Sequence, residues 1–389
     1  MSKTIPIWLP DDRNSGVLTS WFPLERYVSD PDVVFVSDAE NVQELFRARV
    51  ISVAEFLKNS DNYTLPILNL GTSMEYMKQL DFLFKKGGFI FFHQLFLHRL
   101  IENFYIRNGK RDVASLARYG EVAYGKIGKL LAEIGAMNGL EFHEYYLKTF
   151  AVQVAEASVG FCSAWKGAAN LLASESSEAN DILEKSFYLP PPFDVDLRRY
   201  AVGKAAHQSL KLALVGHKNM AKQPEFCMET VRFLNNMGIS ACLVGIGSIG
   251  DYLIEHRSKN ETEMFEKVEA PEHEDFVREI SKCDFIFHFR KPFGGEMPLT
   301  VCECMAVGVP PIGYKADWLM DIPSEAWVGL DVGVSPKEAA EEIRTRLSVE
   351  DSHKSIIASN DSFVIENGSG TKSAEALTNI FSFLRNLQK

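Results

Sequence analysis

Short apolar runs separated by amphipathic segments recur through the first half of the chain. The runs at residues 5–9, 33–37, 65–70, 89–93 and 157–162 have the length of buried strands, and the segments between them have helical spacing. Apolar runs of this kind are typical of parallel strands that helices cover on both faces. Residues 95–150 contain no strand candidate, so we expect a helical insertion there.

The same alternation begins again after residue 210. Strands are predicted at residues 211–216, 240–245, 285–289 and 310–314, with helices at residues 224–236 and 371–387. Between the two halves, LPPPFDVDLRR at residues 189–199 carries three prolines, which remove backbone donors and interrupt helices and central strands. We interpret this stretch as a hinge between two domains.

The pattern therefore predicts an α/β protein with two Rossmann-like, doubly wound domains that face each other across a cleft. The expected domains are residues 1–193, which include the insertion, and residues 194–370, followed by a closing helix at residues 371–389. The length of 389 residues agrees with two domains, because it exceeds the usual size of one core. A cleft between domains is a favoured site for small ligands.

Composition and charge narrow the class of protein. The chain is 46% hydrophobic and 24% charged, as in globular domains, and its net charge of -11 argues against a general nucleic-acid binder. Its six cysteines form no CxxC pair, so we expect reduced, buried thiols. The start, MSKTIPIWLPDDRN, does not resemble a secretion signal, and no apolar run is long enough to span a bilayer. These features predict a cytoplasmic protein.

The segment RKPFGGEMPLTVCECMAVGVPPIG, residues 290–313, has the pattern of an anion site. Gly294 and Gly295 follow a predicted strand and precede a helix expected at residues 299–307, which Gly308 ends. Backbone amides at the start of a helix attract anions, and glycine lets the backbone approach a phosphate. Glu303 lies about two turns into the helix, where it suits a hydroxyl such as that of ribose. An ordinary strand, turn and helix with solvated acids is the alternative.

A second loop repeats this arrangement. After the strand at residues 211–216, a polar loop carries His217, Lys218 and Lys222, and Pro224 is a good first residue for the helix that follows. Lys222 would add positive charge for a bound diphosphate, and a solvated loop lysine is the alternative. Further on, Gly245 to Gly250 read G-x-G-x-x-G, which resembles a dinucleotide fingerprint, but the acid expected about 20 positions later falls in a charged segment without strand character.

Together these motifs resemble the retaining glycosyltransferases of family 4, which have the GT-B fold. The family's loop lysine matches Lys222, and its ribose-binding glutamate matches Glu303 in ECMAVGVP. HFRKPFGGE is similar to a Leu-Arg-x-Pro-x-x-Gly-Glu string of one branch, matching at Arg290, Pro292, Gly295 and Glu296. WLMDIP at residues 318–323 is close to another segment of that branch.

The N-terminal half carries further resemblance. LPILNLGTSMEYM and FIFFHQLFLHRL are similar to two segments of the same branch, and His93 takes the place of a histidine near the sugar. A histidine at the end of a buried strand can donate to a sugar hydroxyl or contact the acceptor, and a structural histidine is the alternative. Gly16 corresponds to the glycine loop near the donor phosphate. Gln94 departs from the branch's aspartate, and Glu296 stands one position from the spacing common in the family.

The resemblance implies transfer of a sugar from a nucleotide-diphosphate donor such as UDP-sugar or GDP-sugar to an acceptor hydroxyl, with retained configuration. Lys222 and the amides around Gly294 and Gly295 would hold the diphosphate, with Arg290 as a further candidate, and Glu303 the ribose. Sites that stabilise a leaving diphosphate depend on cations and backbone donors. The implied catalytic residues are His93, Lys222 and Glu296; the residues expected to line the sugar-phosphate pocket are Glu296, Met297 and Leu299.

No Asp-x-Asp stands in a plausible metal-binding loop, and the DVD at Asp194 lies in the hinge, so we expect a metal-independent enzyme that needs no cofactor besides its donor. The acceptor would be a glycan or a lipid-linked molecule, in polysaccharide or glycoconjugate biosynthesis. Aromatic residues of the insertion suit a core, a sugar platform or contact with the inner face of the membrane, and a core is the default. Two other classes stay open: a catalytically silent GT-B partner subunit, and an NAD-dependent oxidoreductase that uses the Gly245 to Gly250 motif.

Overall fold

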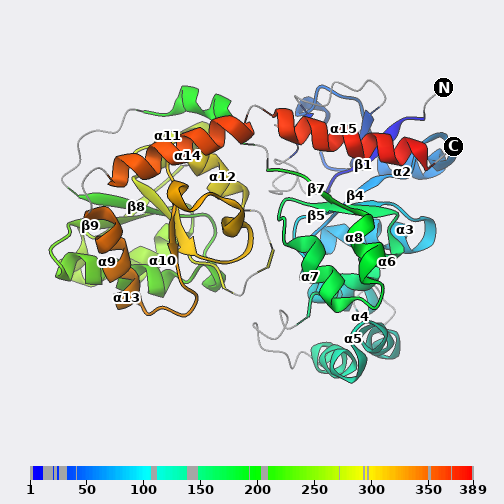
Figure 1. Cartoon of the computed structure of the whole chain (residues 1–389), viewed down its shortest axis with the longest axis horizontal. Coiled ribbons are helices and arrows are strands. Elements are labelled where there is room, and N and C mark those ends of the chain that lie inside the picture. The colour runs from blue at the N-terminus through cyan, green and yellow to red at the C-terminus, as the bar shows by residue number, and fades with distance from the viewer. Residues whose placement is uncertain are drawn as a thin grey trace. The chain divides into compact units, whose positions relative to one another are not determined.

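A computed structural model of the protein describes residues 3–11, 21, 24–25, 33–40, 42–106, 112–137, 148–191, 193–202, 209–270, 272–291, 294–295, 298–348, 352–368 and 370–387. The chain divides into two compact units. The first comprises residues 1–192, 294–297 and 370–389, and the second comprises residues 193–293 and 298–369. Each unit is built around one parallel sheet (Figure 1).

The first unit has a seven-stranded parallel sheet in the order β3-β2-β1-β4-β5-β6-β7. Its strands are β1 (Ile5–Trp8), β2 (Val33–Val36), β3 (Val50–Ile51), β4 (Ile67–Leu70), β5 (Phe89–Phe92), β6 (Gly160–Ser163) and β7 (Ser186–Tyr188). Its helices are α2 (Val53–Lys58), α3 (Met77–Lys86), α4 (His98–Ile106), α5 (Val113–Ala136), α6 (Val152–Ala157), α7 (Ala168–Glu175), α8 (Ala179–Glu184) and α15 (Thr371–Asn386).

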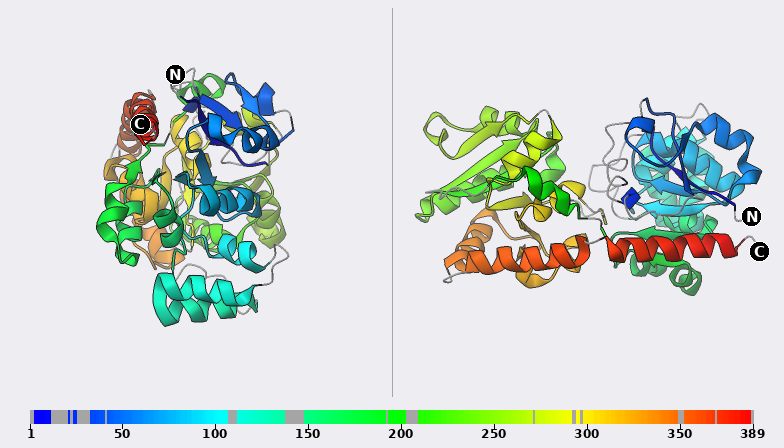
Figure 2. Two further views of the ribbon diagram at one scale, coloured as in Figure 1. Left: turned by 90° about the vertical axis from the view of Figure 1, so that its right-hand side faces the viewer. Right: turned by 90° about the horizontal axis from the view of Figure 1, so that it is seen from above.

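The period of two along each strand divides the core of this unit into two layers. Ile5 and Ile7 face one layer, which α15 completes with apolar residues that include Leu377 and Phe381. Trp8 faces the other layer, where it meets helices α2 and α3 through edge-on contacts of its ring. Helix α15, red in Figures 1 and 2, therefore belongs to the first unit although it ends the chain.

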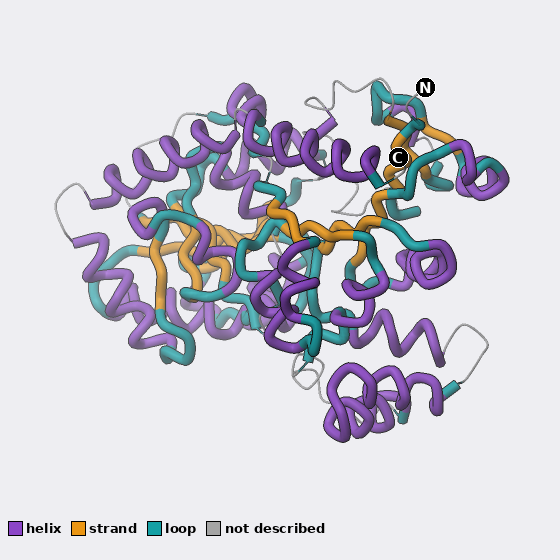
Figure 3. Tube along the Cα trace, turned by 45° about the vertical axis from the view of Figure 1, so that its right-hand side comes forward, coloured by secondary structure: helices purple, strands orange, loops and turns teal. Residues whose placement is uncertain are grey.

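The second unit has a six-stranded parallel sheet in the order β10-β9-β8-β11-β12-β13. Its strands are β8 (Leu210–Val215), β9 (Ala241–Ile246), β10 (Phe265–Val268), β11 (Phe285–His288), β12 (Pro311–Tyr314) and β13 (Val328–Leu330). Its helices are α9 (Pro224–Asn236), α10 (Ile249–His256), α11 (His273–Ile280), α12 (Leu299–Ala306), α13 (Pro336–Ser348) and α14 (Ser352–Gly368). Figure 3 shows helices (purple) on both sides of the strands (orange) in each unit.

The predicted alternation is confirmed, with differences at the weakest signals. All nine predicted strands are present, with limits shifted by up to three residues, but the sequence analysis missed β3, β7, β10 and β13, the outer strands of the two sheets. The expectation that the segment after Gly250 lacks a strand is wrong, because β10 (FEKV) pairs with β9. Strand β10 was missed because its polar residues interrupt the apolar pattern, as is common for a strand at the edge of a sheet, which pairs with one neighbouring strand only. The six cysteines are buried and form no disulfide, as expected.

The proline-rich stretch is not irregular throughout. Its second half forms a 3-10 helix at Val195–Tyr200, where Arg198 donates through Nε to the carbonyl of Ala306, 2.7 Å away. A second nitrogen of Arg198 pairs with Asp361 of α14 at 2.9 Å. These bonds attach the start of the second unit to its own helices α12 and α14.

The insertion folds into α4 and the long element α5. Within α5, Gly125 has non-helical angles (φ 62°, ψ -150°), so two helical segments meet there. Their backbones touch at two glycines, since an added Cβ at Gly120 would lie 2.3 Å from the carbonyl oxygen of Gly128. Among the described residues, no helix is both long enough and apolar enough to cross a membrane.

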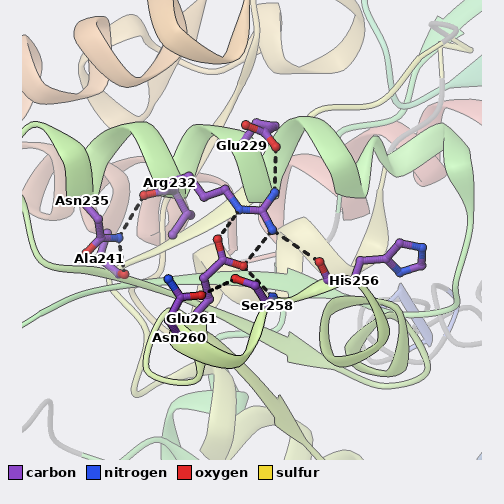
Figure 4. Close-up of polar contacts among 9 residues, drawn as sticks. Glu229, Arg232, Asn235, Ala241, His256, Ser258, Asn260 and Glu261 are labelled. Carbon is purple, nitrogen blue, oxygen red and sulfur yellow. Dashed lines mark hydrogen bonds and ion pairs between the residues drawn. The ribbon is translucent and has the colours of Figure 1, made fainter.

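A polar network on the outside of the second unit ties α9 to the turn before β10 (Figure 4). Arg232 of α9 binds both carboxylate oxygens of Glu261, at 2.7 and 3.0 Å, and also Glu229 at 2.7 Å. Glu261 in turn accepts a bond from the backbone of Ser258 at 2.8 Å. The Arg232 guanidinium lowers the pKa of Glu261 to about 2.

Replacing Glu261 by glutamine is expected to lower the free energy of unfolding by about 2 kcal/mol at pH 7, because it weakens the charge-assisted bonds to Arg232. The folded pKa of Glu261 lies below its ordinary value of 4.5, so its contribution is present above that pH and is lost as the pH falls toward about 2. The difference between wild type and variant should therefore narrow in acid, as measured by urea unfolding.

Glu342→Gln is the matched control for this comparison. Glu342 pairs with Arg346 at 3.4 Å on an exposed helix face, so its replacement should change stability by less than about 0.5 kcal/mol. Equal effects of the two substitutions would contradict a special role for the Arg232 network.

Candidate functional site

The carboxyl edge of the second sheet brings the loops after β8 and β9 into contact. Gly216, which follows β8, donates its N–H to Ile246 at 2.8 Å and accepts a bond from the N–H of Ile249 at 3.0 Å. Gly216 has a positive φ of 100°, and an added Cβ would lie 2.4 Å from Nζ of Lys222. The positive φ favours glycine here, and a side chain at this position would also displace the ammonium group of Lys222.

Lys222 lies at this edge, in the 3-10 helix Met220–Lys222. Its Nζ donates to the carbonyl of Val215 at 2.5 Å, so the ammonium group is held over the end of β8. The next residue, Gln223, has the left-handed conformation (φ 49°) and donates to the carbonyl of Phe289 at 3.1 Å. The N–H of Lys291 donates to Ala221 at 2.9 Å, which joins the lysine loop to the segment after β11.

His288 is the last residue of β11, and the charges of Arg290 and Lys222 affect its pKa. Burial, the largest cause, and the charges of Arg290 and Lys222 together lower its pKa to about 3. His288 is therefore neutral at physiological pH, while Lys222 and Arg290 supply positive charge close to it. Sequence analysis missed His288, although it stands at the end of a predicted strand, the signal that singled out His93.

Glu303 lies on α12, which begins at Leu299 as predicted and ends before Gly308 (φ 80°). Its Oε1 is 2.9 Å from Nε2 of His273, the first residue of α11. The hydrogen bond to Glu303 raises the pKa of His273. Only 18% of the Glu303 side chain is exposed, so His273 holds one carboxylate oxygen of a largely covered group.

Leu299 is half-buried in the first turn of α12, and Arg290 is half-buried two residues beyond β11. Gly294 and Gly295 are grouped with the first unit, where the carbonyl of Gly294 accepts a bond from the N–H of Leu95 at 3.2 Å. Gly295 has a positive φ of 60°, and an added Cβ would lie 3.0 Å from both Leu95 and Trp165. Three predicted site residues, Gly16, Glu296 and Met297, lie outside the described residues.

The carboxyl edge of the first sheet carries a polar cluster around His93. Nε2 of His93 lies 2.8 Å from Oδ1 of Asn69, which also accepts a bond from the indole N–H of Trp21 at 2.9 Å. Asn69 donates through Nδ2 to the carbonyl of Trp8 at 2.7 Å. Burial lowers the pKa of His93 to about 3, so its imidazole is neutral.

A second amide supports this cluster. Gln79 of α3 accepts a bond from the N–H of Asn69 at 2.7 Å and donates to the carbonyl of Leu9 at 3.4 Å. Both amides are buried, with exposed fractions of 1% for Gln79 and 0% for Asn69. Asn69 was not among the predicted site residues, although a polar residue inside an apolar strand is a signal that could have identified it.

The structure thus groups the candidate residues into two sets. In the second unit, Lys222 and Arg290 lie near His288 at the sheet edge, a cationic arrangement suited to a phosphate anion. In the same unit, Glu303 offers carboxylate oxygens suited to hydroxyl groups. In the first unit, His93 adds a neutral imidazole. Among the described residues, no group of three or more His, Cys, Asp or Glu is placed to hold a metal ion.

Comparison with known proteins gives a likeness in structure alone. No family model matches the sequence, and no curated protein does. HepE of Anabaena, solved with UDP and glucose, matches with a TM-score of 0.66 at 11% identity, covering 98% of this chain and 100% of its own. A glycosyltransferase of Rickettsia africae matches with a TM-score of 0.64 at 11% identity, covering 98% of each chain.

A UGT transferase of Siraitia grosvenorii, solved with UDP, matches with a TM-score of 0.55 at 14% identity over the whole of both chains. These likenesses extend over both parallel-sheet units, since each covers nearly the full length of the chain. The protein therefore has the GT-B fold, as the sequence predicts.

Proposed function

We propose that the protein is a glycosyltransferase that moves a sugar from a nucleoside-diphosphate donor to an acceptor hydroxyl. The observation that carries this proposal is the place of Lys222, whose ammonium group is held over the end of β8 by the carbonyl of Val215, with Arg290 two residues beyond the end of the neighbouring strand β11. In open α/β sheets this edge is where ligands bind. The HepE structure with UDP and glucose and the UGT structure with UDP support a uridine nucleotide as the first donor to test.

In the proposed reaction, the bond between the sugar's anomeric carbon and the diphosphate oxygen breaks, and the electron pair stays on the diphosphate. The acceptor oxygen forms the new bond to that carbon and loses its proton, so the products are a glycoside, a nucleoside diphosphate and one proton. Lys222 and Arg290 stabilise the charge that develops on the diphosphate. The proposed site requires no cofactor and no metal ion, and activity in EDTA tests this.

Glu303 is assigned to the ribose. A carboxylate oxygen accepts hydrogen bonds from hydroxyl groups, and within the described part of the chain Oε1 of Glu303 is the oxygen that binds a side chain, that of His273, so Oε2 is assigned to the ribose. Glu296, Met297 and Leu299 are proposed to line the sugar-phosphate pocket, with Gly294 and Gly295 at the phosphate and Gly16 near the donor. Transfer with retained configuration, membership of family 4 and a glycan or lipid-linked acceptor complete the proposal, on the strength of the motif resemblance.

A thermal-shift screen with UDP, GDP, ADP, TDP, CMP and NAD tests the donor class. Stabilisation by one nucleoside diphosphate is the expected result. Stabilisation by NAD alone would contradict the proposal in favour of an oxidoreductase. Binding of UDP without donor hydrolysis or sugar transfer by the wild type, across acceptors, would instead indicate a catalytically silent partner subunit.

Lys222→Ala is expected to weaken UDP binding by roughly 10- to 100-fold, because it removes a charge-assisted contact to the diphosphate. Binding of uridine, which has no phosphate, should change much less. Titration calorimetry with both ligands measures the difference, since a general structural defect would weaken both.

Lys218→Ala is the control, because Lys218 is on the same loop but pairs with Glu255 at 2.9 Å. Its replacement should change UDP affinity by no more than about twofold. If Lys218→Ala and Lys222→Ala weaken UDP binding equally, the assignment of Lys222 to the diphosphate is wrong.

Glu303→Gln is expected to weaken UDP binding by roughly tenfold and to reduce the preference for UDP over 2′-deoxy-UDP. In the wild type, the carboxylate binds the ribose hydroxyl groups, so UDP gains more affinity from it than 2′-deoxy-UDP does. The variant lacks the carboxylate, so the two nucleotides should differ less in affinity. Calorimetry with both nucleotides on wild type, Glu303→Gln and the distant control Glu342→Gln gives the comparison. An unchanged preference in Glu303→Gln would exclude the ribose role.

A further inference from the structure

The amide of Asn69 has one possible orientation. Its Nδ2 lies 2.7 Å from the carbonyl of Trp8, which can only accept a hydrogen bond. Its Oδ1 lies 2.9 Å from Nε1 of Trp21, which can only donate. Exchanging the two amide atoms would set an oxygen against the Trp8 carbonyl, with no hydrogen between them, and an NH2 group against the Trp21 N–H, with no acceptor, in a side chain that is fully buried. Oδ1 therefore faces His93.

This orientation determines where His93 carries its proton. Nε2 of His93 is 2.8 Å from Oδ1 of Asn69, and that oxygen can only accept, so Nε2 must be the donor. A neutral imidazole has one N–H, which leaves a lone pair on Nδ1. Burial keeps the ring neutral down to a pH of about 3. Among the described residues, the ring's hydrogen bonds run through Nε2 alone.

The ring is also held in place by its neighbours. Its centroid lies 4.1 Å from that of Phe91, and the backbone N–H of His93 donates to Leu70 at 2.9 Å. Asn69 is itself held by Gln79 of α3, which accepts a bond from its N–H at 2.7 Å. The bonds thus link the ends of three adjacent strands, β1, β4 and β5.

We propose that Asn69, oriented by Trp21 and the Trp8 carbonyl, is a positioning residue that holds His93 with its proton on Nε2. Nδ1 is then a hydrogen-bond acceptor for a hydroxyl of the carbohydrate substrate, and His93 is not a proton donor to it. The carbohydrate part of this assignment rests on the proposed glycosyl transfer, but the position of the proton does not.

The tautomer is measured directly by long-range proton–nitrogen NMR of the wild-type protein labelled with nitrogen-15. The His93 signals are assigned as those lost in His93→Gln. We expect the nitrogen-15 chemical shift of Nε2 to be that of a protonated nitrogen and the shift of Nδ1 to be that of an unprotonated one. Both chemical shifts should stay unchanged from pH 8 to about pH 5. Protonation at Nδ1, or on both nitrogens in this range, would overturn the proposal whatever the enzyme's activity.

Two substitutions separate positioning from packing. Asn69→Leu removes the acceptor, so His93 should populate both neutral tautomers, and kcat/KM should fall roughly tenfold while UDP affinity stays the same. Asn69→Asp keeps an acceptor oxygen for Nε2 but loses the bond to the Trp8 carbonyl and raises the pKa of His93, so the proton should stay on Nε2 and the tautomer is read at pH 8. If Asn69→Leu does not fold, the wild type and Asn69→Asp decide the question by NMR alone.

The control is Asn360→Leu. Asn360 is another fully buried asparagine, which donates to the carbonyl of Met305 at 3.0 Å in the second unit, so its loss should reduce stability without altering the His93 tautomer. An Asn69→Leu protein that keeps the wild-type tautomer would refute the role of Asn69. If the wild type does not bind UDP, that result counts against the proposed function but does not affect the conclusion about the His93 tautomer.

Discussion

Parallel pairing of the strands is the constraint on which both units depend. A parallel sheet needs a crossover between successive strands, and the crossover helices cover both faces, so the interior strands are mostly apolar. Ligands bind to open sheets of this kind at the edge where the strands end and the loops begin. His93, His288 and Lys222 all lie at or just beyond such strand ends. The direction of the strands therefore decides where these three side chains lie.

Burial keeps His93 and His288 neutral, although different groups surround the two rings. His93 and His288 both have a pKa near 3 because their rings are desolvated. His93 faces the neutral amide of Asn69, which fixes the place of its proton, whereas His288 is near Lys222 and Arg290, which oppose any protonation. His273 differs from both, because its exposed ring pairs with the carboxylate of Glu303 and its pKa is raised. The groups next to each imidazole ring thus decide whether the ring is protonated and which of its nitrogens carries the proton.

Strong local signals allowed much of this to be predicted. The limits of α9 at Pro224 and Asn236 match the prediction, because a first-turn proline and a clear apolar stripe mark them. Strand β10 was missed, since Glu266 and Lys267 interrupt its apolar pattern, and Lys267 pairs there with Asp251 and Glu269. Edge strands have one neighbour and one open side, so their composition says less about their conformation.

By itself, the sequence determined the fold class, the start of α12 at Leu299 and the residue types suited to a nucleotide, because these follow from apolar periodicity and from local chemistry at strand ends. Only the tertiary structure decided which side chains act together. The pairing of Glu303 with His273 joins residues 30 positions apart, and the contact of Trp21 with Asn69 joins residues 48 apart. Such contacts arise from the packing of distant elements, and no local pattern of residues encodes them.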